Sequence, residues 1–494
     1  MKKQPNIIFI ISEQHNSAVM GCMGDPYIKT PNLDKLAQKS LVLDNCYCNA
    51  PLCVPSRSSL LAGRLPHDIR VYNNHQSLHH DIPTVAHSLN IAGYETVLSG
   101  RMHFYGPDQY HGYEKHLVGD VTPTYQGEES DGKIWGKLDG SMRQKKTGLQ
   151  RSGAGCSAAF AFDEDVRDTT VEFLESRTDE RPLFLTVGLF CAHPPFICPE
   201  ERFRYYYNLL PELPVIDNLE TIHPAMRAWM ENREVPDITR EDVRRVRAAY
   251  YGMVELMDEM VGTVIDKVNQ TMDMENTLIV YTADHGECIG LNNLFWKANF
   301  YDASVKVPAM IAVPNGQKGV HEKGLTCLAD LTATFVDCGG GMPLPGQYGH
   351  SLIGVSKGTE RVSLDRSIIS QLGAYPRSGD HAAAMIRRGN YKLISYYGYD
   401  IPQLFDLEND PEERYDLGSV AEYQDRIREL EAELYQNWDA QKAEKDCQEA
   451  LENSKVLSKW AKVTKYPIPE HWNSSHAENY LLAEEQQENK GDLL

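Results

Sequence analysis

The sequence has no long apolar run. Its apolar stretch nearest the N-terminus, residues 7–11, is followed directly by Ser12, Glu13 and Gln14. That stretch is too short to be the core of a signal peptide and far too short to span a bilayer. We therefore predict a protein that makes no membrane contact and is located in the cytoplasm.

Cysteine and positive charge are also scarce. The 494 residues include 11 unevenly spaced cysteines, which do not form a disulfide framework and fit a reducing compartment. The formal net charge is −21, whereas a nucleic-acid-binding protein needs a basic face, so nucleic acid is not an expected partner. The chain is 41% apolar and 24% charged, as in ordinary globular proteins. Its length suits an α/β enzyme with one large and one smaller domain.

The most informative stretch begins at Cys53 and reads Cys-Val-Pro-Ser-Arg-Ser-Ser-Leu-Leu-Ala-Gly-Arg. Pro55 suits the first turn of a helix, because its missing N–H would have no partner there. Cys53 would then lie at a helix N-terminus, where backbone N–H groups favour an anion. Arg57 adds a planar cation suited to sulfate or phosphate. This pattern predicts a nucleophile beside an oxyanion site.

Four clusters of polar residues follow short apolar segments that are typical of buried strands. Ligands of open α/β sheets bind at the carboxyl ends of the strands, so we expect the clusters to meet there. Carboxylate and amide oxygens suit Ca²⁺ or Mg²⁺. The clusters are Glu13 and Gln14 after residues 6–11, Arg101 and His103 after 94–99, His193 after 183–189, and Asp284 and His285 after 276–282.

The C-terminal third changes character near residue 365. Short strands separated by turns then predict an antiparallel sheet. We expect a catalytic domain over residues 1–365, an α+β subdomain over 366–438 and a polar arm over 439–494. The arm needs a surface to pack on, which would be the core or a neighbouring subunit, so we also expect a homo-oligomer.

The Cys53 stretch resembles the sulfatase signature Cys-x-Pro-Ser-Arg-x-x-Leu-x-x-Gly-Arg at every specified position. The resemblance to sulfatases of the alkaline-phosphatase superfamily extends over about residues 5–435. It implies an α/β fold with a large domain, built on a mixed central sheet flanked by helices, and a smaller C-terminal α+β domain with an antiparallel sheet. It also implies that a formylglycine-generating or sulfatase-maturating enzyme converts Cys53 to formylglycine, whose hydrate is the nucleophile.

The same resemblance implies roles for the clustered residues. Ca²⁺ rather than Mg²⁺ would be bound by Glu13, Gln14, Asp284 and His285 beside residue 53. Arg57, Arg101 and Lys297 would hold the charge of the sulfate, His193 or Lys297 would protonate the leaving alcohol, and His103 would help collapse the sulfated hydrate. Two positions depart from the family pattern: Glu13 stands where Asp is usual, and Arg101 stands where Lys is usual.

Within the family, residues 70–74 and 106–114 look like choline sulfatases. That branch tends to place an aromatic residue where this chain has Gln126-Gly127-Glu128, and an acid where it has Gln371. We therefore expect Asn74, Glu128 and Gln371 to contact a sulfated carbohydrate or another small organic sulfate. The alternatives are a choline sulfatase, a phosphonate or phosphate monoester hydrolase, and a non-catalytic oxyanion- or glycan-binding relative.

Overall fold

The central sheet is built around β1 (Asn6–Ser12), which lies between two parallel neighbours. The computed structural model describes residues 4–122, 132–214, 219–374, 379–464 and 471–484. Strands β6 (Leu183–Gly188) and β8 (Thr277–Ala283) flank β1, and every residue in both is buried. Their near-continuous apolar sequences are those of strands covered on both faces. The three predicted strands are therefore the middle of the sheet.

The sheet is mixed, as expected. Its order is β11-β2-β10-β8-β1-β6-β3-β4, with β9 paired to β2. Strand β10 runs antiparallel to β8 and β2, and β9 runs antiparallel to β2, while the other pairs are parallel. The outer strands are β2 (Leu41–Tyr47), β3 (Glu95–Gly100), β4 (Lys115–His116), β9 (Lys306–Val307), β10 (Ala309–Ala312) and β11 (Val320–Cys327).

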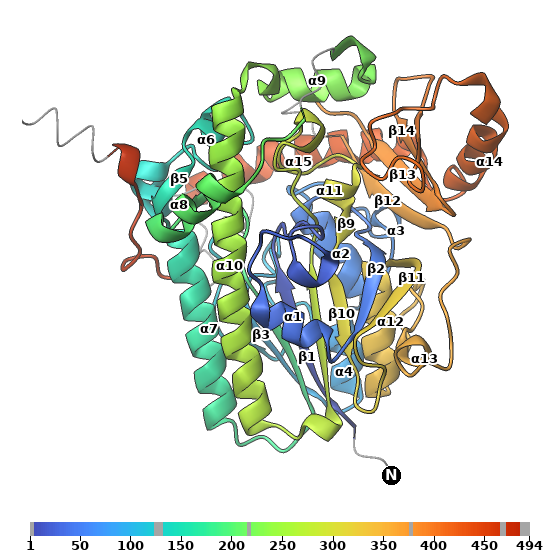
Figure 1. Cartoon of the computed structure of the whole chain (residues 1–494). Helices are drawn as coiled ribbons and strands as arrows, with labels where there is room; N and C mark the ends of the chain where they lie inside the picture. Colours follow the sequence, from blue (N-terminus) through green and yellow to red (C-terminus); the bar gives the residue numbers. More distant parts are fainter. Residues whose placement is uncertain (1–3, 123–131, 215–218, 375–378, 465–470, 485–494) are drawn as a thin grey trace, which may run out of the picture.

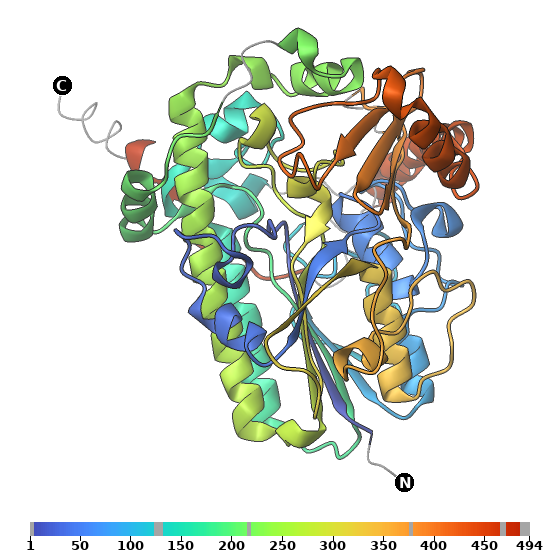
Figure 2. The ribbon, with the colours of Figure 1, turned by 45° about the vertical axis from the view of Figure 1, so that its right-hand side comes forward.

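Helices cover both faces of this sheet, giving three layers (Figures 1 and 2). One face carries α1 (Pro31–Ala37), α7 (Ala158–Ser176) and the long α10 (Arg240–Thr271), which Thr239 and Asp242 begin with a capping box. The opposite face carries α2 (Cys53–Ala62), α4 (Val85–Ile91) and α12 (Leu328–Gly339). Shorter helices are α3 (Pro66–Ile69), α5 (Gly132–Trp135), α6 (Lys146–Gln150), α8 (Glu200–Leu209), α9 (Pro224–Asn232), α11 (Asp302–Val305) and α13 (Ile353–Ser356).

The smaller C-terminal sheet is fully antiparallel, and its order is β12-β13-β14-β15. A buried ion network ties it to the large sheet layer: Lys392 of β14 donates to Asp302 at 2.7 Å and also contacts Glu413. Both predicted parts of the fold are thus present. The elements are β12 (Ile368–Leu372), β13 (Ala383–Arg388), β14 (Tyr391–Tyr396), β15 (Gln403–Asp406) and α14 (Gln424–Leu434).

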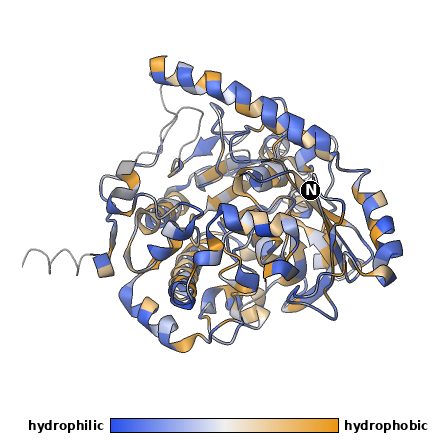
Figure 3. Ribbon diagram, turned by 90° about the horizontal axis from the view of Figure 1, so that it is seen from above, coloured by the Kyte–Doolittle hydropathy of each residue, from blue (hydrophilic) through white to orange (hydrophobic). Residues whose placement is uncertain are grey.

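The C-terminal arm packs on this same chain. Its helix α15 (Ala440–Thr464) runs along one side of the molecule, as the view from above shows (Figure 3). Farther on, β16 (Tyr480–Leu481) pairs with β5 (Gly153–Cys156), which also pairs with β7 (Ile197–Cys198). Among the described residues, no helix is both long enough and apolar enough to cross a membrane.

Candidate active site

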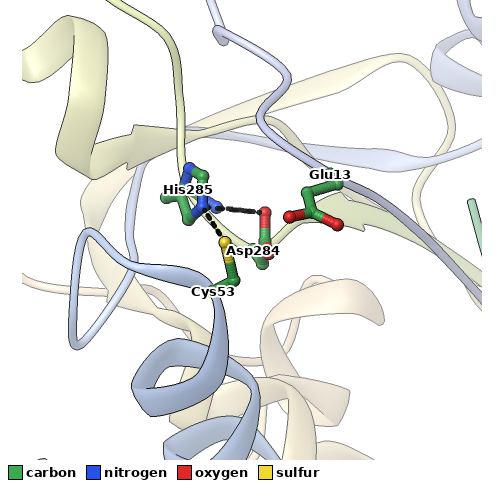
Figure 4. Close-up of side chains that lie close together, drawn as sticks. All are labelled: Glu13, Cys53, Asp284 and His285. Carbon is green, nitrogen blue, oxygen red and sulfur yellow. Dashed lines mark hydrogen bonds and ion pairs between the residues drawn. The ribbon is translucent and has the colours of Figure 1, made fainter. Parts of the chain in front are cut away.

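Glu13, Asp284 and His285, from two of the predicted clusters, meet Cys53 at the carboxyl edge of the large sheet (Figure 4). Ligand atoms of Glu13, Cys53, Asp284 and His285 all lie within 4.8 Å of one another, and all four residues are buried. Glu13 follows β1, Asp284 and His285 follow β8, and Cys53 is the first residue of α2. Residues separated by up to 272 positions in sequence therefore form one group because β1 and β8 are parallel neighbours.

Cys53 is 1% exposed, and its Sγ lies 3.2 Å from Nε2 of His285. Burial raises the pKa of the Cys53 thiol, and the negative charge of Glu13 raises it further, whereas Lys297 lowers it. The net effect is a pKa far above the usual range for cysteine. Since the thiolate is the nucleophilic form of cysteine, this thiol is poorly suited to attack a substrate directly.

Glu13 is held ionised by its surroundings. Burial raises the pKa of its carboxyl group, but Arg101, His193, Arg57 and Lys297 together lower it well below the usual range. Nε2 of His193 lies 3.7 Å from Glu13 Oε1, and Arg101 donates from Nε to Oε2. An ionised carboxylate supplies the oxygen ligands that a hard divalent metal ion prefers.

Arg57 and Arg101, two buried arginines of the same centre, form a cationic wall. Nε of Arg57 donates to Asp284 Oδ2 at 2.9 Å, and its Nη1 donates to the carbonyl of Arg101 at 2.8 Å. Nη2 of Arg57 is buried and has no hydrogen-bond partner among the described residues. A buried guanidinium N–H without an acceptor is costly, so this atom indicates a place for an anion.

All three guanidinium nitrogens of Arg101 donate hydrogen bonds. It donates to Glu13, to Asp120, to Thr122 Oγ1 at 2.6 Å and to Nδ1 of His103 at 2.6 Å. Because a guanidinium only donates, Nδ1 of His103 accepts and the proton of the neutral ring lies on Nε2. In this arrangement His103 can act toward a bound group as a donor, and its part in collapsing the sulfated hydrate stays a prediction.

The three histidines are neutral at pH 7. Burial and the charge of Arg101 lower the pKa of His103 to about 3, burial lowers that of His285 to about 4, and burial with Lys297 lowers that of His193 well below its usual value. Nδ1 of His285 donates to the carbonyl of Gly286 at 3.0 Å, so its Nε2 presents a lone pair to the cluster. That lone pair suits a metal ion.

Lys297 and Gln14 complete the centre. Lys297 is 1% exposed, and its Nζ donates to Oε1 of Gln14. Gln14 has a φ of 63°, and the residues on either side of Lys297, Trp296 and Ala298, have φ values of 59° and 63°. These left-handed conformations are strained for non-glycine residues and mark a backbone held by its surroundings.

Three buried carboxyl residues in contact with the site were not predicted. Asp120 binds Arg101 and the backbone N–H of His103, Asp163 accepts the N–H groups of Phe190 and Cys191 at 2.6 and 2.8 Å, and Glu287 binds Gln14. Of the three, Asp163 could have been found from the sequence, because it is a charged residue on the apolar face of α7. Glu287 directly follows the cluster after β8, but nothing in its spacing indicated its partners.

The predicted substrate-binding residues differ in their surroundings, and of them Asn74 lines the cavity described below. Oδ1 of Asn74 accepts the backbone N–H of Val54 at 3.0 Å, so it supports the start of α2. Gln371 is 0% exposed, and its amide binds the backbone N–H of His67 at 3.0 Å and the carbonyl of Asn437 at 2.7 Å. Both polar ends of Gln371 are used, which corrects its assignment to substrate contact. Glu128 lies outside the described residues.

A cavity of about 760 Å³ opens beside the centre. Leu52 and Ala298, the neighbours of Cys53 and Lys297, contribute to its wall. Aromatic and polar groups share this wall, among them Asn74, Trp229, Arg233, Asp380, Tyr396 and Tyr399. Arg233 stacks on Trp229 at 4.1 Å and binds Asp380 at 2.9 Å. The cavity therefore offers ring faces and hydrogen-bonding groups to an organic substrate.

Comparison with known proteins identifies the class. A model of the sulfatase family matches residues 5–341, and one described as N-sulphoglucosamine sulphohydrolase, C-terminal, matches residues 290–440. Because the first match covers more than half of the chain, this protein belongs to the sulfatase family and is a sulfuric ester hydrolase.

Two related sequences and one solved structure show how similar this chain is to individual proteins. The chain is 34% identical over 430 residues to a choline-sulfatase of Rhizobium meliloti (strain 1021), covering 84% of this chain and 82% of that protein. It is 26% identical to an arylsulfatase of Clostridium perfringens (strain 13 / Type A), with coverages of 86% and 92%. A phosphonate monoester hydrolase of Agrobacterium radiobacter has a similar fold, with a TM-score of 0.72 at 22% identity over 87% of this chain and 96% of that one. The predicted family and fold class are confirmed.

Proposed function

We propose that this sulfatase cleaves a small organic sulfate monoester, using formylglycine made from Cys53 by a maturating enzyme. The observation that carries the proposal is a buried thiol at the start of α2, inside a ring of buried cations. The cations suit a sulfate, whereas the thiol is a poor nucleophile as it stands. The Sγ atom of Cys53 stands where the hydrate oxygens of formylglycine would be.

The residues fit a calcium ion. Glu13, Gln14 and Asp284 offer oxygen atoms and His285 offers a lone pair, while a pair of thiolates, which would favour zinc, is absent from the described cluster. Bound there, Ca²⁺ would draw charge from the sulfate oxygens and from the oxygen at residue 53. Metal analysis of the purified protein should find one calcium per chain; zinc at full occupancy in a fully active sample would refute this assignment.

The side chains divide the remaining work. Arg57, whose Nη2 has no hydrogen-bond partner among the described residues and lies 3.8 Å from Glu13 Oε2, and Lys297 hold the charge that develops on the sulfate oxygens. Nδ1 of His193 donates to the carbonyl of Pro194 at 2.8 Å, so its Nε2 carries no proton in the neutral ring. We therefore assign protonation of the leaving alcohol first to Lys297, with His193 accepting or relaying a hydrogen bond.

This assignment can be tested with leaving groups of different basicity. Lys297→Ala should slow an alkyl sulfate far more than an aryl sulfate, because a phenolate leaves readily without a proton. His193→Ala should slow both to a similar degree. If the alkyl-selective loss appears in His193→Ala instead, the proton donor is His193.

The substrate proposal is a sulfated carbohydrate or another hydroxyl-bearing small sulfate. The size of the cavity and its mixed aromatic and polar wall support it. Choline sulfate is the second candidate, supported by the relative named a choline-sulfatase and by the ring faces of Trp229 and Tyr396.

Two measurements test the proposal. Intact-mass analysis of the peptide containing Cys53 should show the aldehyde in active samples, and an unmodified thiol in fully active protein would refute it. A side-by-side assay of sulfated monosaccharides, choline sulfate and an aryl sulfate should then rank the substrates. Selective hydrolysis of choline sulfate would replace the first candidate by the second.

A further inference from the structure

Glu287 is a fully buried carboxylate between two parts of the centre. It is 0% exposed and lies two residues beyond His285. One of its oxygens, Oε1, accepts the backbone N–H of Ile289 at 3.0 Å and also that of Trp296. The other oxygen, Oε2, accepts from Nε2 of Gln14. A carboxylate buried this deeply needs hydrogen-bond donors around it, and here three N–H groups donate to it.

The side-chain amide of Gln14 is hydrogen-bonded at both ends, to a donor at its oxygen and to an acceptor at its nitrogen. The ammonium of Lys297 can only donate, so it selects the oxygen of the amide. The carboxylate of Glu287 accepts, so it selects the nitrogen. Amide orientations are normally ambiguous, but these two neighbours leave one arrangement that makes both hydrogen bonds.

The selected arrangement turns the amide oxygen toward the metal-binding cluster. Gln14 directly follows Glu13 of the cluster, and Lys297, which binds the amide oxygen, is buried in the same centre. The backbone N–H of Gln14 donates to Oδ1 of Asp284 at 3.0 Å, which fixes the main chain at the same spot. The nitrogen of the amide points away, to Glu287.

We propose that Glu287 is a positioning residue that holds Gln14 with its oxygen, and not its nitrogen, facing the metal. This inference rests on the proposed role of calcium and names a group that touches neither the metal nor the substrate. Carboxylates that orient metal ligands from outside the coordination sphere typically change metal affinity or activity by about 10–100-fold when removed.

The same carboxylate also fixes the loop that carries Lys297. Ile289 and Trp296, the two residues whose N–H groups it accepts, have φ values of 43° and 59°. These conformations persist only when surrounding contacts hold them. Glu287 therefore positions the side chain of Gln14 and also the loop that carries Lys297, the residue that binds the amide oxygen of Gln14.

Glu287→Gln is the informative single change, because it keeps the size of the side chain. The one remaining oxygen is needed by the two backbone N–H groups, so the new NH₂ faces Gln14. Gln14 must then turn its oxygen to that NH₂ and present its own NH₂ to Lys297 and the metal. We expect calcium affinity to fall by about 10–100-fold.

The exchange variant, which combines Gln14→Glu with Glu287→Gln, tests the reason for that loss. The carboxylate introduced at position 14 can accept from the NH₂ introduced at position 287 and from Lys297, and it still presents an oxygen to the metal. Total charge and the number of hydrogen bonds are those of the wild type. We expect calcium affinity within roughly a factor of three of the wild type, so the two changes are strongly non-additive.

The experiment is calcium titration calorimetry on full-length, metal-stripped protein, with thermal unfolding in chelator as a check on folding. Glu95→Gln is the matched control: Glu95 is also a fully buried carboxylate, but it binds Lys115 and Arg177 at the opposite end of β3. This control should bind calcium like the wild type.

The outcomes separate the inference from the proposed function. Loss in Glu287→Gln with recovery in the exchange variant supports the inference. The inference is overturned if Glu287→Gln binds calcium with the affinity of the wild type. It is also overturned if the exchange variant binds calcium as weakly as Glu287→Gln. In either case calcium binding by the wild type is unaffected. If the single variant does not fold, the exchange variant alone decides. Absence of calcium binding in the wild type overturns both.

Discussion

Arg101 shows how the charge and the shape of one side chain serve different purposes. A lysine would keep the positive charge, yet it could not reach Glu13, Asp120 and His103 in three directions as the guanidinium does. Glu13 and Asp120 would then lose charge-assisted hydrogen bonds in a buried site. The Arg is thus matched to a longer acid, Glu13, and to Asp120, which the signature of the family did not indicate.

We predict that Arg101→Lys lowers kcat/KM by about 10–100-fold, because each buried charge-assisted hydrogen bond contributes about 1.5–3 kcal/mol. Steady-state kinetics on a sulfate ester, with calcium content measured in the same samples, will show this. Arg177→Lys is the control, since Arg177 binds Glu95 away from the site. Equal activity of Arg101→Lys and the wild type would show that only the charge matters.

We predict that Cys53→Ala removes ester hydrolysis and leaves the fold intact. No other nucleophile is proposed in the described centre, and replacing a buried Cys by Ala removes one atom, so the loss of stability should be about 1 kcal/mol. Activity assays and thermal unfolding will measure both effects. Near-normal turnover by this variant would contradict the mechanism.

The secondary-structure elements explain why the sequence predicted so much of the site. Residues after β1, β3, β6 and β8 were expected to meet because parallel strands end at one edge, and they do. Gln371 was misassigned because an ungapped alignment cannot show that its amide joins α3 to the chain after α14. Asp120 and Glu287 depend on side-chain partners, which no spacing in the sequence encodes.

The arm supports the site through one aromatic residue, Trp472. Its backbone N–H donates to the carbonyl of Asp120 at 3.1 Å, and its indole N–H donates to Asp165 at 2.7 Å. The indole also meets the ring of Phe162 at 5.5 Å, and Phe162 meets Phe190, over which Arg101 lies at 5.0 Å. A segment far along the chain thus packs behind the cationic wall.

We predict that Trp472→Ala lowers the free energy of unfolding by about 3–5 kcal/mol, the usual loss for a buried Trp, and weakens activity through the position of Asp120. Denaturant unfolding and kinetics will measure the two effects. The control is Trp460→Ala on α15, where the side chain is 46% exposed. A stability loss no larger than that of the control would show that the arm is dispensable.

At the scale of the whole molecule, a chain of net charge −21 encloses a centre rich in buried cations. The acidic surface therefore says little about the ligand, because a local pocket can oppose the overall charge. Buried charges also connect the two parts of the fold. The ion network of Lys392, Asp302 and Glu413 joins the C-terminal sheet to α11, which follows shortly after Lys297.

Buried neutral histidines should make the folded protein sensitive to acid. Burial lowers the pKa of His15 to about 4, where its Nε2 donates to the carbonyl of Val19 at 2.9 Å and its Nδ1 accepts from Tyr281 at 2.7 Å. Between pH 6.5 and 4 the unfolded chain binds the proton and the folded one does not, so stability is complete above pH 6.5 and declines as pH falls.

We therefore predict that the free energy of unfolding decreases between pH 6.5 and 4, and that His15→Gln reduces the slope by about one proton. Urea unfolding at a series of pH values will give both slopes. His321→Gln is the control, because His321 is 42% exposed. An unchanged slope in His15→Gln would show that this residue is charged or exposed in the folded protein.

The burial of Cys53 also fixes an order of events in time. A side chain that is 1% exposed and lies among buried charged residues is out of reach of a modifying enzyme once the chain has folded. The proposed conversion to formylglycine therefore requires residues 53–64 as an unfolded peptide, before β8 brings in Asp284 and His285 more than two hundred residues later. On this proposal, a chain that folds before it is modified stays inactive.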